Sequence, residues 1–573
     1  MKTIQAIFGK KWQLKLASLV AVLVGTSAWV FNQVKDINPA ILQDEWVYQV
    51  TSRLYSPWAQ DLPFDFGNYL YNLVYGSTNL CGEAFYTCAK VLNLAFLQGF
   101  ALTLFVIALR FLPFWGALAL YGAAALSPTS VYASMYLPEP MFFFLLGLTL
   151  LAILRAANNP SWKNWALVGL PLALAALVKP HALIAAMAIG IYLLISGLEK
   201  RPYWKPALLN AAALLGSFLA VRFVIGFAVA GPKALNPFNA YGASGAVGEF
   251  VGSVSSGQAA TEAASLIGAG PVVGAVGLFP TQFFTHTMVV AALLGASVTV
   301  IVLAGIHSVV SKSTRPIHRF SVLTLVWLLL MMVAIVLFTG WITGGGDDHT
   351  TRVLLRYYDY LFPIVALAGA AVAADKEILT ATKGWVRWLI AGPVFLLISI
   401  AFAGYFGTLT IQIADAPNLA GLVVDKVTFD TTGNLTMLVL LLIAFFPRFA
   451  IWGFAAMVPF TLVMTGYQIQ DQYQGFRMED SAADKAGHFT AETLDVQQRD
   501  DLLILAETRF DARVASFWLE HNTDIELLGP ESVYPVANLP EGTKWVLAIG
   551  NLSMESGEVI STEEGYKLYK IQD

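Results

Sequence analysis

Apolar segments of membrane-spanning length run through the first 467 residues and constrain the fold more than any other feature of the chain. A transmembrane helix needs about 20 mostly apolar residues, and charged residues make up only 13% of this sequence, about half of their share in soluble domains. We therefore predict a polytopic α-helical membrane protein with about 13 transmembrane helices. The predicted helices cover residues 15–34, 91–109, 112–131, 138–155, 164–178, 182–198, 206–228, 288–310, 320–340, 358–374, 386–405, 433–447 and 449–467.

Charge placement predicts how these segments are oriented. Lysines precede the first segment, which places the N-terminus inside, since cytoplasmic loops carry the excess of Lys and Arg. Alternating from there, 17 basic residues fall inside and 8 outside, with Arg222 within a segment. We expect a multi-pass membrane protein whose first segment is an uncleaved signal-anchor, because no convincing cleavage site follows it. An odd number of segments then leaves the C-terminus outside.

The tail differs from the rest of the chain in charge. From Asp471 to the end it holds 20 acidic and 8 basic residues, and it is not basic enough to suggest nucleic acid as a partner. We predict a transmembrane domain over residues 1–470, with outer loops at 35–90, 229–287 and 341–357. Residues 471–573 would form a soluble extracytoplasmic α/β accessory domain. Its expected elements are strands at 502–506 and 545–550, a helix at 511–521 and an edge strand at 566–571.

Three carboxylates stand out in the predicted outer loops. Asp44 and Glu45 follow the first apolar segment by about ten residues, and Glu139 opens the fourth. An acidic side chain near a bilayer is unfavourable, so a chemical role is plausible for each. Glu139 has a structural alternative, because a carboxylate at a helix N-terminus interacts well with the helix dipole. We expect most of the aromatic residues of the first loop to anchor the membrane interface, with stacking on a sugar as the alternative.

Cations form a second candidate group on the same side. Lys179 and His181 lie in a short turn, where Lys179 suits an anion but also suits simple contact with the interface. Arg352 and Arg356 are four residues apart and would share one face if that stretch is helical, which suits a phosphate. The alternative is surface pairing with acidic neighbours. Weak candidates for a divalent metal site are Asp347, Asp348 and His349.

The only two cysteines, Cys81 and Cys88, lie in the first outer loop. A disulfide between them is plausible in an oxidising compartment. Two free, half-buried thiols are the alternative. The long 229–287 loop is rich in Gly, Ala, Ser and Val and fits either a mobile lid or a plain linker.

Taken together, these features resemble the GT-C superfamily of integral-membrane glycosyltransferases, which includes protein O-mannosyltransferases, lipid A aminoarabinose transferases and arabinofuranosyltransferases. The matching elements are Asp44-Glu45-Trp46-Val47-Tyr48, Glu139, Val178-Lys179-Pro180, and Arg356-Tyr357 with Pro363. The resemblance implies a polyprenyl-phosphate-linked sugar as donor and a bacterial plasma membrane with an extracytoplasmic site. The acceptor would be a hydroxyl of an envelope glycan, a glycolipid or a protein, attacking with inversion.

The resemblance also implies roles for these residues. Asp44 would be the general base, with Glu45 as the alternative, and Glu139 would orient the acceptor or the donor sugar. Arg356, Arg352 and Lys179, with His181 beside them, would bind the donor phosphate. No cofactor is required on this account, although some members of the superfamily use a divalent metal. The competing hypotheses are a transporter or flippase of a lipid-linked sugar and a non-catalytic subunit of a polysaccharide assembly complex.

Overall fold

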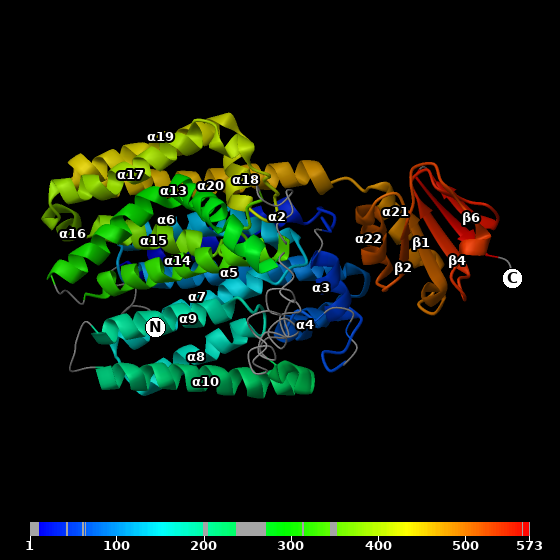
Figure 1. Cartoon of the computed structure of the whole chain (residues 1–573), viewed down its shortest axis with the longest axis horizontal. Helices are drawn as coiled ribbons and strands as arrows, with labels where there is room; N and C mark the ends of the chain where they lie inside the picture. Colours follow the sequence, from blue (N-terminus) through cyan, green and yellow to red (C-terminus); the bar gives the residue numbers. More distant parts are fainter. Residues whose placement is uncertain are drawn as a thin grey trace.

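The structure, a computed structural model, describes residues 11–41, 44–59, 62, 65–198, 204–236, 271–311, 315–343, 352–563 and 565–571. It consists of a long helical bundle and a small α/β domain that follows one end of the bundle (Figure 1). The predicted lid in the 229–287 loop lies mostly outside the described residues, as do all three weak metal candidates, Asp347, Asp348 and His349.

Each of the 13 predicted segments falls on one helix of the bundle. Within the described part of the chain, nine helices are long and apolar enough to cross a membrane, and three more are apolar but shorter. Helix α8 (Trp162–Ala176), on which the predicted segment 164–178 falls, belongs to neither group. The protein is therefore a multi-pass helical membrane protein. The helices are α2 (Trp12–Val34), α5 (Phe85–Ala108), α6 (Phe114–Ala125), α7 (Glu139–Asn158), α8 (Trp162–Ala176), α9 (Ala182–Leu198), α10 (Trp204–Ala230), α13 (Pro271–Ser311), α14 (Pro316–Thr343), α15 (Leu361–Ala374), α17 (Gly384–Phe402), α19 (Lys426–Phe445) and α20 (Ala450–Arg477).

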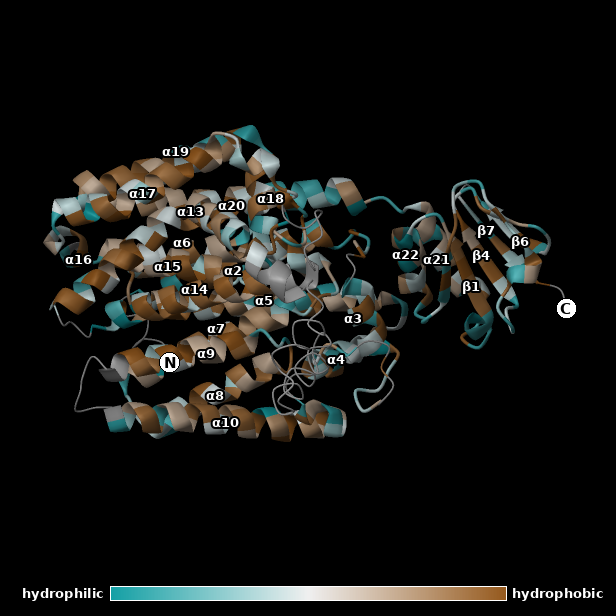
Figure 2. Cartoon of the chain, in the orientation of Figure 1, coloured by the Kyte–Doolittle hydropathy of each residue, from teal (hydrophilic) through white to brown (hydrophobic). Residues whose placement is uncertain are grey.

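The outer helices of the bundle are apolar without being buried. In the most apolar stretches of α2, α10 and α17, only 11%, 22% and 17% of the residues are buried. Brown, apolar residues cover α10 and α17 along most of their length in Figure 2. Exposing that much apolar surface to water is unfavourable by about 25 cal/mol for each Å², so lipid is the environment that this surface fits.

Short elements close the two ends of the bundle. At one end, Arg315 pairs with Asp375 and Glu377, and the Nε of Arg387 donates to the Ala444 carbonyl at 3.2 Å. The other end carries the segments that follow α2. Short elements between the long helices are α3 (Asp44–Arg53), α4 (Tyr69–Gly76), η1 (Ser77–Ala84), η2 (Pro128–Ser134), η4 (Gly231–Leu235), α16 (Lys376–Ala381), η7 (Tyr405–Thr408), α18 (Pro417–Val423) and η8 (Pro447–Phe449).

The first outer loop is folded rather than extended. It contains α3, α4 and η1, and a disulfide joins Cys81 in η1 to Cys88 in α5. Most of its aromatic side chains are buried in the protein, so the expectation that they mainly anchor the membrane interface is wrong. Those less than 6% exposed are Trp46, Tyr48, Tyr69, Tyr71 and Tyr75.

The C-terminal domain is a five-stranded mixed sheet in the order β2-β1-β4-β7-β6. The parallel strands β1 and β4 are nearly fully buried, as continuous apolar runs predict. The predicted edge strand is β7, but β7 lies between β4 and β6, so that expectation is wrong; β6 forms the edge. The elements are α21 (Ala482–Thr493), η9 (Gln498–Asp501), β1 (Leu502–Ala506), α22 (Arg509–Leu519), β2 (Asp524–Leu527), β3 (Val533–Tyr534), η10 (Val536–Asn538), β4 (Trp545–Ile549), β5 (Ser553–Met554), β6 (Glu558–Glu563) and β7 (Tyr566–Lys570).

Buried polar contacts tie this domain to the bundle. Helix α20 continues past residue 471 to Arg477, whose guanidinium makes two bonds to the Asp484 carboxylate, at 2.9 and 3.0 Å. On α22, Phe517 packs its ring 5.3 Å from that of Tyr86, and Glu520 pairs with Arg53 at 2.7 Å. The domain is therefore held against α3 and the start of α5, next to the first outer loop.

Candidate functional site

Asp44 and Glu45 open helix α3, and the helix directs them to different surroundings. Successive residues of an α-helix point about 100° apart, so neighbours in sequence do not share an environment. The side chain of Asp44 is 30% exposed and accepts a hydrogen bond from Nη2 of Arg356. Glu45 is fully buried. Of the adjacent pair, only Asp44 faces the arginine.

Glu45 connects three segments of the outer end. Its two carboxylate oxygens accept backbone N–H bonds from Ile41 at 2.9 Å and from Tyr136 at 2.8 Å. The Tyr86 hydroxyl donates to the same carboxylate at 3.4 Å. Burial raises the pKa of Glu45 to about 6, against the opposing effect of these hydrogen bonds. In the structure, Glu45 therefore holds the backbone around the site.

Arg352 and Arg356 converge on a residue that the sequence did not single out, Asp415. The Nε of Arg352 donates to Asp415 at 2.7 Å, while the Nε of Arg356 lies 3.9 Å from the other carboxylate oxygen. The backbone N–H of Arg356 also donates to the Asp415 carbonyl at 2.8 Å. The stretch 352–360 contains a bridge and turns rather than a helix, so the helical spacing proposed for the two arginines does not apply.

Glu139 and Lys179 form a buried ion pair. Lys179 Nζ donates to Glu139 Oε1 at 2.6 Å, and both side chains are at most 3% exposed. Burial lowers the pKa of Lys179, although the carboxylate of Glu139 opposes this effect. The Pro138–Glu139 junction starts α7 without a side-chain cap, so the carboxylate of Glu139 is used for the lysine rather than for capping the helix.

Tyr357 joins the two charged pairs. Lys179 Nζ and the Arg356 guanidinium each lie 5.0 Å from the centre of its ring, within cation–π range. The His181 ring stacks on it at 4.5 Å. Arg356 also donates to the Tyr357 hydroxyl at 3.2 Å. Three cationic or ionisable side chains from two separate segments are thus arranged around one aromatic ring.

A cluster of tyrosines borders the Glu139 carboxylate. Tyr71 stacks on Tyr75 at 4.1 Å and meets Tyr136 edge-on at 6.3 Å. Within the described part of the chain, the Tyr71 hydroxyl and Glu139 Oε2 are buried and have no hydrogen-bond partner. Because a buried polar atom without a partner is unfavourable by about 1–3 kcal/mol, these two atoms are suited to bind an incoming polar group.

Sequence reasoning missed Asp415 and the central position of Tyr357. Asp415 lies in an apolar stretch before α18, and its partners are about 60 residues away in sequence, so no local pattern indicates the contact. In the sequence, Tyr357 stood out only because it follows Arg356. The described residues contain no group of three or more His, Cys, Asp or Glu placed to hold a metal ion.

Residues 79–225 match the family model described as dolichyl-phosphate-mannose-protein mannosyltransferase. No curated protein matches. Among solved structures, ArnT from Cupriavidus metallidurans in the apo state has a TM-score of 0.45 at 14% identity, covering 96% of this chain and 97% of that one.

The Archaeoglobus fulgidus oligosaccharyltransferase tethered with an acceptor peptide has a TM-score of 0.49 at 12% identity, covering 95% of this chain and 70% of that one. The family match spans α5 and the helices up to α10, and it includes Glu139, Lys179 and His181. Protein O-mannosyltransferases are one of the groups within the superfamily that the sequence resembles. The match confirms the predicted resemblance of this chain to the GT-C superfamily of membrane glycosyltransferases.

Proposed function

We propose that this protein transfers a sugar from a polyprenyl-phosphate donor to an acceptor hydroxyl, with inversion, on the extracytoplasmic side of a bacterial plasma membrane. The observation that carries the proposal is the contact between Asp44 and Arg356, next to the Glu139–Lys179 pair. A candidate base and two candidate phosphate-binding cations thus lie around one tyrosine ring, at the end of the bundle that charge placement puts outside.

The reaction follows from these groups. The acceptor oxygen attacks the anomeric carbon, its proton passes to the Asp44 carboxylate, and the bond from that carbon to the phosphate oxygen breaks. The electron pair of the broken bond stays on the phosphate, which gains negative charge as it leaves. Arg356 and Lys179 stabilise that charge as fixed cations. A single displacement of this kind inverts the anomeric centre.

The surroundings of the two adjacent acids favour Asp44 as the base. Glu45 has both oxygens occupied by backbone N–H groups and no exposed surface. Using it as a base would break the contacts that hold the 135–136 turn. Asp44 is partly exposed, and to act as a base it would have to give up only its ion pair with Arg356.

Donor binding would provide that exchange. A phosphate forms bidentate bonds with a guanidinium as well as a carboxylate does, so a donor phosphate can replace Asp44 on Arg356. The freed carboxylate is then available to the acceptor hydroxyl. Asp415 keeps Arg356 in position during the change, because it holds the arginine through backbone and side chain. Arg352 supports the same aspartate.

The buried atoms without partners fit the donor sugar. Glu139 Oε2 and the Tyr71 hydroxyl each lack a hydrogen bond within the described part of the chain, and sugar hydroxyls both donate and accept. Lys179 holds the other oxygen of the Glu139 carboxylate, which fixes its orientation. We therefore assign Glu139 to the sugar rather than to proton transfer. We propose that no metal ion is needed, since Arg356 and Lys179 supply the positive charge.

The test uses purified protein in lipid nanodiscs with a panel of polyprenyl-phosphate sugars and mixed envelope acceptors. Release of polyprenyl phosphate is measured for wild type, Asp44→Asn and Arg356→Ala, with and without a chelator. Asp36→Asn is the control, since Asp36 is a 62% exposed acid of the same loop. We expect turnover in wild type and control, unaffected by the chelator, and at least a 100-fold loss, on the order expected for general-base removal, in Asp44→Asn.

Turnover that survives Asp44→Asn would refute Asp44 as the base. Loss of turnover with the chelator would refute the proposal that no metal is needed. Transport of the lipid-linked sugar across the membrane without release of polyprenyl phosphate would instead support the transporter hypothesis.

A further inference from the structure

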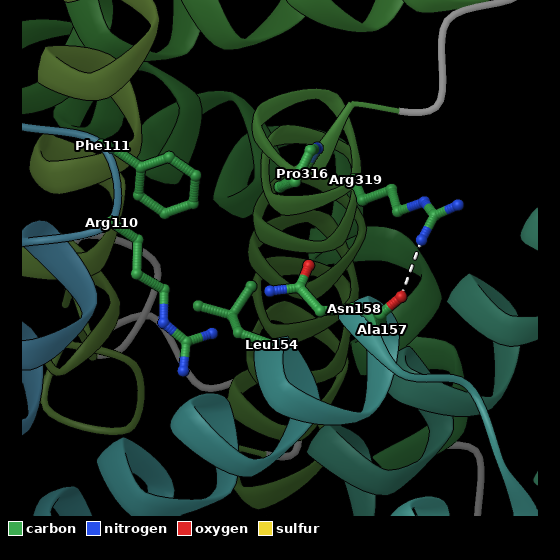
Figure 3. A pocket seen from close by; sticks show the side chains of 7 residues that line it. All are labelled: Arg110, Phe111, Leu154, Ala157, Asn158, Pro316 and Arg319. Carbon is green, nitrogen blue, oxygen red and sulfur yellow. Dashed lines mark hydrogen bonds between the residues drawn. The ribbon is translucent and has the colours of Figure 1, made fainter.

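A pocket lies at the end of the bundle away from the candidate active site. It has a volume of about 370 Å³, and its polar lining consists of Arg110, Asn158 and Arg319 (Figure 3). Helix α7 connects the two places, since Glu139 is its first residue and Asn158 its last. At 1.5 Å per residue, its 20 residues span about 30 Å, which is the thickness of the hydrocarbon core of a bilayer.

The pocket carries positive charge that no acid compensates within the described residues. The Arg110 side chain makes no hydrogen bond or ion pair there, and its pKa is lowered by partial burial and by the nearby Arg155. Arg319 donates from Nη1 to the Ala157 carbonyl at 2.7 Å, a contact drawn in Figure 3, and is not part of an ion pair. Both arginines therefore line the pocket, and neither has an acidic partner among the described residues.

The apolar wall of the pocket is packed in place. The Phe111 ring stacks on Phe320 of α14 at 5.4 Å with an interplanar angle of 6°. This contact fixes the α5–α6 connection against α14, and Leu154 and Pro316 complete the apolar lining. The shape of the pocket therefore does not depend on a bound molecule.

Exposed tryptophans show that this end lies at a membrane interface. Five of them, between 47% and 72% exposed, lie near the starts of helices α6, α8, α17 and α20. Tryptophan is enriched at the level of lipid head groups. Arg319 near the start of α14 contacts Ala157 at the end of α7, and α8 begins a few residues later. Arg387 near the start of α17 contacts Ala444 at the end of α19, just before α20 begins. These helix starts therefore lie at the same end of the bundle as the pocket. The five residues are Trp115, Trp162, Trp385, Trp388 and Trp452.

We infer that this pocket binds the phosphate of an anionic lipid head group. Guanidinium groups bind phosphate oxygens with bidentate geometry, and the Asn158 amide can donate a further hydrogen bond. The apolar wall of Phe111, Leu154 and Pro316 suits the glycerol and first methylenes of a lipid. The inference does not depend on the proposed glycosyl transfer, because the pocket shares no residue with that site.

The test is native mass spectrometry of the delipidated full-length protein, titrated with phosphatidylglycerol or phosphatidylcholine. We expect wild type to bind phosphatidylglycerol more tightly, and Arg110→Gln to weaken that binding about tenfold, as the loss of one charged hydrogen-bonding group would. Because the Arg110 side chain makes no hydrogen bond or ion pair among the described residues, its replacement should not unfold the chain. Arg448→Gln is the matched control, since Arg448 is an exposed arginine at the same end; it should bind like wild type.

Three outcomes would overturn the inference. The first is unchanged phosphatidylglycerol binding in Arg110→Gln and in the charge reversal Arg110→Glu. The second is an equal loss in Arg448→Gln, which would indicate a general effect of positive charge rather than a site. The third is displacement of the lipid by soluble glycerol phosphate at the same concentration, which would show that the pocket takes a free phosphate and not a lipid.

Discussion

Removing Lys179 should destabilise the protein by a predictable amount. Its ammonium lies 2.6 Å from Glu139, and both side chains are almost completely buried. Lys179→Met keeps the apolar stem but leaves the Glu139 carboxylate buried with neither oxygen paired. Breaking a buried ion pair in this way lowers the free energy of unfolding by about 3–5 kcal/mol. For a large chain, at roughly 2 °C for each kcal/mol, Tm should fall by roughly 6–10 °C.

The double variant Glu139→Leu/Lys179→Met separates stability from function. Replacing both members of a buried pair by apolar residues of similar size is often neutral or stabilising, so Tm should return to within about 2 °C of wild type. Glu139→Leu alone should cost less than Lys179→Met, because burial already lowers the pKa of Lys179 and the lysine can lose its proton. The proposed function requires the double variant to be inactive despite its recovered stability.

Scanning fluorimetry in nanodiscs gives the Tm of the four proteins, and release of polyprenyl phosphate gives their activity. A double variant that melts as low as Lys179→Met would show that the two side chains are not energetically coupled. A double variant with wild-type turnover would contradict the roles assigned to Glu139 and Lys179 at the site.

Three further predictions concern residues around the site. Glu45→Gln should flatten the pH dependence of stability, because burial raises the pKa of this carboxyl from its ordinary value of 4.5 to about 6 in the folded protein. The carboxyl therefore stabilises the fold below pH 4.5, and ~2 kcal/mol of that stability is lost as the pH rises from 4.5 to 6; a variant whose Tm changes with pH as in wild type over this range would contradict it. Asp415→Asn should raise the donor KM about tenfold with a smaller effect on kcat, since Asp415 holds the phosphate-binding Arg356; steady-state kinetics measures both. Arg477→Leu leaves Asp484 buried without its cation, so limited proteolysis should release the C-terminal domain faster than in wild type.

The bundle was predictable because membrane spans need only composition and length. All 13 predicted segments fall on helices, including 164–178 and 433–447, which are short for a span. In the tail, continuous apolar runs predicted β1 and β4, whereas no run predicted that β7 lies between two other strands of the sheet. Its alternating pattern indicates one exposed face, but which strands flank it depends on chain connections that no local pattern contains.

The site was predictable only in part. Charge placement put Asp44, Glu139, Lys179 and Arg356 on one side of the membrane, but it could not pair them, since each partner lies 40 or 312 residues away. The choice between Asp44 and Glu45 needed the direction of α3, which sequence alone does not give. Asp415 was missed for the same reason: its role comes entirely from contacts between distant segments.

The two ends of α7 differ in how their cations are balanced, and this difference has a functional consequence. At the outer end, Arg356 pairs with Asp44 and Lys179 with Glu139, whereas Arg110 at the other end has no acidic partner among the described residues. A phosphate at the Arg110 pocket simply supplies a missing counter-charge. A donor phosphate at the outer end must replace a carboxylate. Under the proposed function, donor binding there would be weaker than the cations alone would allow. It would release the Asp44 carboxylate only when a donor is present, which would protect the site from activating an acceptor without one.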